Sequence, residues 1–233
     1  MSSKRERTSP SKEGGPRRRS EAPLYAFSVG IGTKPFLRRL YRMEVHGRER
    51  VPATGGAILV ANHESLLDPW LLALATPRPV RYMAKAELWR YPVVRNVMEW
   101  FGTFPVERGK GDRSAIGRAE QLLADGEVLG VFPQGTCLPY PRRPWHRGAA
   151  RLALVTGVPV VPVALVDSEK ALRPRKPKLG FPRVKVLVGD PITMQGPPTI
   201  ANAKELTARI EGAVDELRAP YGPPAHVWFD EAA

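Results

Sequence analysis

The sequence is poor in cysteine and contains no long apolar run. A single cysteine, Cys137, excludes an internal disulfide framework and fits a reducing compartment. A membrane-spanning helix needs about 20 apolar residues, whereas the longest apolar runs, such as Ala57–Ala61 and 158–166, are only strand-sized. The N-terminus is basic but lacks an apolar segment next to a cleavage site, so we expect no secretory signal. Any membrane contact should therefore be peripheral.

Acidic side chains are scarce relative to basic ones. The chain has 36 Lys and Arg against 23 Asp and Glu, which gives a formal net charge of +13. Such a field attracts nucleic acid, an anionic membrane surface or acidic small molecules. Zinc-ligand spacings and stacking-aromatic motifs are absent from the sequence, which argues against a nucleic-acid partner. An anionic membrane surface is the partner that we expect.

Two segments precede the part with globular character. Residues 1–23 are rich in Ser, Lys, Arg, Gly and Pro, which predicts a disordered basic tail. Residues 24–46 are apolar and basic, and we assign them to an amphipathic membrane-interface segment. The alternative is a helix packed on the domain with its arginines exposed. The apolar positions that share a helical face are Phe36, Leu37, Leu40 and Tyr41.

Strand-sized apolar runs alternate with helical patterns through residues 47–220. The predicted strands are 57–61, 80–84, 102–107, 128–132, 158–166 and 184–188. The predicted helices are 69–76, 87–100 with a break at Pro92, 112–124, 147–156 and 202–217. This alternation predicts an α/β domain with a largely parallel central sheet flanked by helices. Residues 221–233 should form a C-terminal tail.

Two local features refine this arrangement. Pro159 and Pro162 favour a place at the sheet edge for the strand 158–166, because proline cannot donate a hydrogen bond to a neighbouring strand. Asp68, directly before Pro69, has the residue type and the position of a helix N-cap.

A histidine and an aspartate follow the first buried strand. His63 and Asp68 are five residues apart, so they can meet only if the chain turns between them. An imidazole held by a carboxylate is a competent general base, because the carboxylate fixes the tautomer and stabilises the imidazolium. Taken alone, such a pair arises easily by chance, and the N-cap would fully explain Asp68.

Three further segments gain meaning only in combination. Arg108 lies in a glycine-flanked loop, where a guanidinium group can bind two phosphate oxygens. Residues 132–137 follow a strand, and Gly135 lets their backbone approach a ligand closely. Residues 158–163 are apolar with two prolines. Taken singly, these segments are typical of a solvated loop, a turn and a core strand.

Together, in this order and spacing, the four elements resemble the motifs of the glycerolipid acyltransferase family, whose best-known members are 1-acylglycerol-3-phosphate acyltransferases. The family motif N-H-x-x-x-x-D is matched by Asn62, His63 and Asp68, and G-x-x-x-x-x-R by Gly102 and Arg108. The motif F-P-E-G-T-R is matched in part by Phe132, Pro133, Gly135 and Thr136, and the apolar V-P-x-x-P-V motif by 158–163. The resemblance covers about residues 47–188 and implies a glycerol-3-phosphate acyltransferase-like fold.

The resemblance also implies a reaction. His63 would remove the proton from the hydroxyl of a lysophosphatidic-acid-like lipid, and that oxygen would attack the thioester of acyl-CoA or acyl carrier protein. Asp68 would orient His63. The chemistry implied needs no metal and no cofactor beyond the acyl donor. It would run at the cytoplasmic face of the membrane, in phospholipid biosynthesis. The substrate-binding residues implied are Asn62, Ser65, Arg108, Gln134, Gly135 and Thr136.

The third motif departs from the family pattern at two positions. Gln134 stands where the family has Glu, and Cys137 stands where it has Arg. Loss of that Arg removes a charge-assisted phosphate contact worth about 1.5–3 kcal/mol. Arg142, Arg143 or Arg147 could replace it. Alternatively, the acceptor is another lysolipid or a glycolipid, or the protein binds lipid without catalysis.

Overall fold

A seven-stranded sheet organises the computed structural model, which describes residues 34–100, 102–106, 113–137, 144–172 and 179–222. The strands are β1 (Glu44–His46), β2 (Ala57–Ala61), β3 (Val80–Lys85), β4 (Phe104–Val106), β5 (Val128–Val131), β6 (Val160–Val166) and β7 (Lys185–Val188). Their order is β1-β7-β6-β2-β5-β3-β4, and every neighbouring pair is parallel except β6 and β7. The predicted α/β class with a largely parallel sheet is therefore confirmed.

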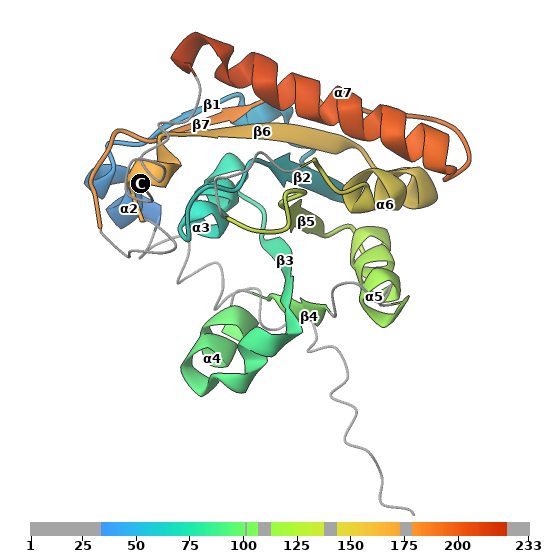
Figure 1. The fold of residues 1–233 in the computed structure, drawn as a ribbon, viewed down its shortest axis with the longest axis horizontal. Coiled ribbons are helices and arrows are strands. Elements are labelled where there is room, and N and C mark those ends of the chain that lie inside the picture. Colours follow the sequence, from blue (N-terminus) through green and yellow to red (C-terminus); the bar gives the residue numbers. More distant parts are fainter. Residues whose placement is uncertain (1–33, 101, 107–112, 138–143, 173–178, 223–233) are drawn as a thin grey trace, which may run out of the picture.

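Helices cover both faces of this sheet. They are α2 (Lys34–Leu40), α3 (Asp68–Leu72), α4 (Pro92–Trp100), α5 (Arg113–Ala124), α6 (Gly148–Thr156) and α7 (Ile200–Arg218). Short 3-10 turns are η3 (Arg48–Arg50), η4 (Ala73–Ala75), η5 (Ala86–Arg90), η6 (Ser168–Lys170) and η7 (Ala219–Tyr221). Helices α5, α6 and α7 pack on one face, whereas α2, α3 and η4 pack on the other (Figure 1).

The central strands are apolar on both sides because both faces of the sheet are covered. In β2, Ile58 and Val60 join the core under α5, α6 and α7, whereas Leu59 and Ala61 join the core under α3. All residues of β2 and β6 are buried. Continuous apolar runs, rather than alternating ones, are what a sheet covered on both faces requires.

The prediction that the strand with two prolines lies at the sheet edge is wrong. Strand β6 lies between β7 and β2, in the interior of the sheet. Pro159 precedes the strand. Pro162 lies one residue before the segment registered with β7, which starts at Val163, and its carbonyl accepts a hydrogen bond from Gly189 N–H (2.8 Å). Pro162, which has no N–H, thus lies just beyond the residues of β6 that pair with β7.

The predicted helix break at Pro92 is confirmed, since η5 ends at Arg90 and α4 begins at Pro92.

Several sequence predictions concern residues outside the described ranges. These are the tail 1–23, residues 24–33 of the amphipathic segment, residues 223–233, and the arginines Arg108, Arg142 and Arg143.

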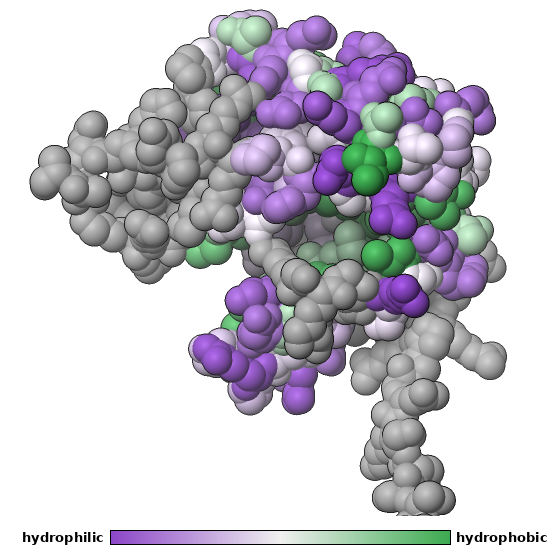
Figure 2. Space-filling view, turned by 45° about the vertical axis from the view of Figure 1, so that its right-hand side comes forward, coloured by the Kyte–Doolittle hydropathy of each residue, from purple (hydrophilic) through white to green (hydrophobic). Residues whose placement is uncertain are grey.

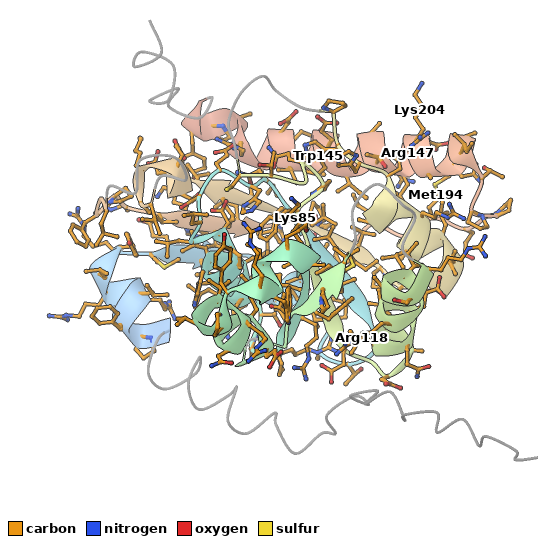
Figure 3. All side chains as sticks on the ribbon, turned by 60° about the horizontal axis from the view of Figure 1, so that its bottom comes forward. Lys85, Arg118, Trp145, Arg147, Met194 and Lys204 are labelled. Carbon is orange, nitrogen blue, oxygen red and sulfur yellow. The ribbon has the colours of Figure 1, made fainter. Side chains whose placement is uncertain are left out.

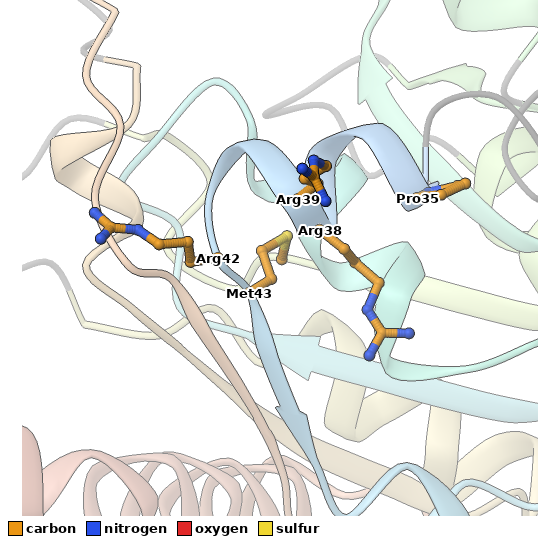
Figure 4. Close-up of a pocket in the computed structure, with 5 residues that line it drawn as sticks. All are labelled: Pro35, Arg38, Arg39, Arg42 and Met43. Atoms are coloured by element: carbon orange, nitrogen blue, oxygen red, sulfur yellow. The ribbon is translucent and has the colours of Figure 1, made fainter.

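The described part of the amphipathic segment packs on the domain. Tyr41 is buried, and Leu37 and Leu40 lie against the same core, whereas the Phe36 side chain is 63% exposed. Three exposed arginines, Arg38, Arg39 and Arg42, line an open hollow together with Pro35 and Met43 (Figure 4). Contact of this segment with a membrane stays a prediction. No helix within the described ranges has the length and apolar character needed to cross a bilayer.

Candidate active site

The motif with His63 and Asp68 and the motif at residues 132–137 meet at the carboxyl end of the central strands. Strands β2 and β5 are parallel neighbours, with Val60 opposite Val131, so their carboxyl ends emerge side by side. The loop 62–67 follows β2 and the loop 132–137 follows β5. The backbone N–H of His63 donates a hydrogen bond to Oε1 of Gln134, which joins the two loops directly.

His63 and Asp68 are in contact, as the sequence predicts. Nδ1 of His63 lies 2.9 Å from Oδ2 of Asp68, and Asp68 is fully buried while the His63 side chain is 17% exposed. A carboxylate only accepts hydrogen bonds, so Nδ1 carries the proton and Nε2 is left with a free lone pair. That arrangement is the one a general base needs.

Asp68 is not the helix cap that the sequence predicts. The N-cap position of α3 is Leu67, and it makes no side-chain capping bond. Instead, Oδ2 of Asp68 accepts the backbone N–H groups of Glu64 (2.6 Å) and Ser65 (2.7 Å) as well as His63 Nδ1. The carboxylate therefore folds the preceding loop around itself, and the turn brings His63 and Asp68 together.

Aromatic rings support the other side of the imidazole. The His63 ring stacks on Phe132 with centroids 4.3 Å apart, and the Phe132 ring is followed by Tyr82 at 6.3 Å. The Tyr82 hydroxyl donates a hydrogen bond to the carbonyl of Pro69 (2.6 Å), next to Asp68. Gly130 makes this stack possible, because a Cβ there would lie 2.3 Å from Tyr82 Cε1. Sequence reasoning missed Tyr82 and the stacking role of Phe132.

Two predicted substrate-binding residues hold the backbone. The buried side chain of Asn62 bonds Leu165 twice, donating to its carbonyl (2.9 Å) and accepting from its N–H (2.8 Å). Ser65 is also buried, and its hydroxyl donates to the carbonyl of Leu172 (2.9 Å). These bonds fix the loop 62–67 against neighbouring segments. Substrate contacts by Asn62 and Ser65 stay predictions.

The third motif forms a turn beside His146. Gly135 has φ +72°, and its N–H bonds to the carbonyl of Phe132 (3.0 Å). His146 N–H bonds to the carbonyl of Pro133 (2.9 Å), and its imidazole lies so close that a Cβ on Gly135 would be 3.2 Å from Cδ2. The exposed Arg147 is the next residue, so it lies near this turn. Substrate contacts by Gln134, Gly135 and Thr136 stay predictions.

Basic and apolar groups surround this edge of the sheet. Lys85 ends β3 and Arg147 precedes α6, and both are labelled with Trp145 in Figure 3. The space-filling view shows one face of the molecule, which is hollowed and has apolar residues among the hydrophilic ones (Figure 2). Among the described residues, no group of three or more His, Cys, Asp or Glu side chains is arranged to hold a metal ion.

Comparisons with known proteins agree with this arrangement. A family model described as Acyltransferase matches residues 42–166. The 1-acyl-sn-glycerol-3-phosphate acyltransferase of Bacillus subtilis is 27% identical over 177 residues, which are 76% of this chain and 86% of that protein. The lyso-ornithine lipid O-acyltransferase of Pseudomonas aeruginosa is 38% identical over 109 residues, 46% of this chain and 41% of that protein.

A solved structure shares the fold. The crystal structure of the 1-acyl-sn-glycerophosphate acyltransferase from Thermotoga maritima matches with a TM-score of 0.66 at 21% identity, covering 89% of this chain and 86% of that one. At that identity the likeness concerns the fold, and the implied acyltransferase-like fold is confirmed. Because the family model matches more than half of the residues, the chain belongs to the acyltransferase family.

Proposed function

We propose that the chain transfers a fatty acyl group from acyl-CoA or acyl carrier protein to the free hydroxyl of a lysophosphatidic-acid-like acceptor, in phospholipid biosynthesis. The observation that carries the proposal is the His63–Asp68 hydrogen bond at the carboxyl end of β2. Relatives whose names include 1-acyl-sn-glycerol-3-phosphate acyltransferase support the acceptor class.

In this proposal His63 is the general base. Nε2 removes the proton from the acceptor hydroxyl while the hydroxyl oxygen attacks the thioester carbonyl. The tetrahedral intermediate then collapses, the C–S bond breaks, and the imidazolium returns the proton to the leaving thiolate. Asp68 stabilises the imidazolium through Nδ1. A thioester is activated enough for this scheme to need neither a metal nor a cofactor other than the acyl donor.

Because Cys137 replaces the family arginine, the acceptor phosphate needs a cation in addition to the predicted Arg108. Arg147 is a described candidate, since its neighbour His146 bonds to Pro133 in the third-motif turn. The same replacement supports a second candidate function, acylation of a different lysolipid. A relative named as a lyso-ornithine lipid O-acyltransferase is in line with it.

We also propose that the protein works as a peripheral protein at the cytoplasmic face of a membrane. The exposed Phe36, Arg38 and Arg39 on α2 and the exposed Arg42 just after it support this proposal. Basic residues near an anionic leaflet contribute about 1 kcal/mol each to binding. The rest of the positive charge would attract the phosphates of acyl-CoA.

The test is an acylation assay with a panel of acceptors. Purified protein in vesicles receives radiolabelled acyl-CoA or acyl carrier protein, with lysophosphatidic acid and other lysolipids tested separately. We expect labelled product that disappears in His63→Ala and persists in His46→Ala, because His46 is an exposed histidine on the edge strand β1, which β7 and β6 separate from β2. Product formed equally by His63→Ala would disprove the base assignment. Binding of vesicles with no product on any acceptor would favour a non-catalytic lipid-binding protein.

A further inference from the structure

A buried ion pair connects the candidate active site to the end of the last helix. Glu64 lies between His63 and Asp68 in the loop that follows β2, and Arg218 is the final residue of α7. Nη1 of Arg218 lies 2.6 Å from Oε1 of Glu64, and the two residues are only 8% and 5% exposed. The proposed reaction leaves this pair without a role.

The surroundings of Glu64 disfavour its charge. Burial, with smaller contributions from the negative charges of Glu169 and Asp68, raises the pKa of Glu64 from 4.5 to about 7, even though Arg218 lowers it. The second oxygen, Oε2, is buried and has no hydrogen-bond partner within the described part of the chain. Apolar residues of similar volume often replace such pairs without loss of stability. A buried pair of this kind is therefore weak evidence for stabilisation, and a positional role explains it better.

The backbone of Glu64 reaches the catalytic pair directly. Its N–H donates to Oδ2 of Asp68 (2.6 Å), the same oxygen that accepts the hydrogen bond from Nδ1 of His63. The side chain of Glu64 thus helps to fix the peptide group that joins Glu64 to His63. Movement of Glu64 would disturb the acceptor geometry of Asp68 and the orientation of the imidazole together.

Arg218 is held from the opposite direction. The buried face of α7, which includes Leu206, Ile210 and Val214, packs on the sheet. Arg218 lies at the last turn of that anchored helix, and its own side chain is almost fully buried. The helix therefore presents a cation at a fixed position under the loop 62–67.

We propose that Arg218 is a positioning residue, which acts through Glu64 to hold His63 and Asp68 in the geometry of a general base. The inference rests on the proposed function, because positioning of His63 matters only if His63 acts as a base. It assigns a role in the reaction to the end of α7, more than 150 residues along the chain from the catalytic loop.

The kinetic test uses Arg218→Gln, Glu64→Gln and the double variant, with Arg209→Gln as a matched control on the exposed face of α7. We expect each single variant to lower kcat about tenfold while KM for both substrates stays within about twofold. The double variant should be no worse than the singles, because one interaction is lost in all three. Arg218→Lys should recover part of kcat, since it keeps the charge.

A second readout does not depend on turnover. The Nδ1 proton of His63, hydrogen-bonded to Asp68, should give a low-field proton resonance that is absent in His63→Ala. We expect this resonance in wild type and Arg209→Gln, and its loss in folded Arg218→Gln. An unchanged resonance, or a fall in kcat explained entirely by the unfolded fraction, would overturn the proposal. If wild type acylates no acceptor, the resonance still tests the positioning by itself.

Discussion

A single side-chain oxygen at position 134 connects the two motif loops. Oε1 of Gln134 accepts the N–H of His63, and this bond needs only an acceptor oxygen, which glutamine and glutamate share. The replacement of the family Glu by Gln therefore leaves the loop contact intact. The resemblance implied a substrate-binding residue at this position, and the geometry adds a structural role for it.

We expect Gln134→Glu to keep acyl transfer within about threefold of wild type and Gln134→Leu to lower kcat about fivefold or more. Leucine leaves the His63 N–H without its acceptor, a loss of about 1 kcal/mol. Steady-state kinetics on the acceptor that wild type prefers gives the comparison, and thermal melting verifies that both variants are folded. Full activity in Gln134→Leu would show that this hydrogen bond does not orient the catalytic loop.

At the scale of single residues, the sequence predicted contacts better than roles. The family resemblance implied the contact between His63 and Asp68, and their spacing required a turn between them, which the structure contains. The cap assigned to Asp68 was wrong because its carboxylate bonds the N–H groups that precede it, and residue type at a helix start cannot distinguish these directions. The Glu64–Arg218 pair was missed because no local pattern relates residues so distant in sequence.

At the scale of elements, apolar run length predicted strands well and their order poorly. Six predicted strands correspond to observed ones, because both faces of the sheet are covered and the runs are continuous. The short β1 was missed, since three residues carry little periodicity. The proline rule placed β6 at the edge, whereas the register with β7 lets an interior strand accommodate Pro162.

Arg78 joins the loops at the amino ends of the central strands. Its guanidinium donates to the carbonyls of Pro52 (2.7 Å), Gly55 (2.6 Å) and Gly126. We expect Arg78→Ala to lower the free energy of unfolding by about 2 kcal/mol or more, because three carbonyls lose a charged donor. Urea denaturation measures it, with Arg151→Ala on the exposed face of α6 as control.

Arg78→Lys should recover little of this stability, since an ammonium group lacks the planar fork that reaches several acceptors at once. Equal unfolding free energies for Arg78→Ala and Arg151→Ala would contradict the role of Arg78 as a connector of loops.

At the scale of the whole molecule, the candidate site is assembled from distant parts of the chain. The loop after β2 supplies the base, His63. The loop after β5 supplies the Phe132 ring and the Gln134 side chain beside it, and α7 supplies the buried Arg218. The family resemblance assigned the first two loops to one site, and they meet because β2 and β5 are parallel neighbours whose carboxyl ends lie side by side. The contact between Arg218 and Glu64 depends on how α7 crosses the sheet, which the hydrophobic periodicity of the sequence does not predict.

The buried Glu64 makes stability depend on pH in a defined direction. Its pKa is raised from 4.5 to about 7 in the folded protein, so between these values the folded state holds a proton that the unfolded state releases. The free energy of unfolding that this bound proton contributes is fully present below pH 4.5. It is lost as the pH rises towards 7, with a slope of at most about 1.4 kcal/mol per pH unit. Glu64→Gln cannot titrate, so its stability relative to wild type should rise across this window. Urea unfolding of both proteins from pH 4.5 to 8 measures the difference, and a difference independent of pH would show that Glu64 keeps an ordinary pKa beside Arg218.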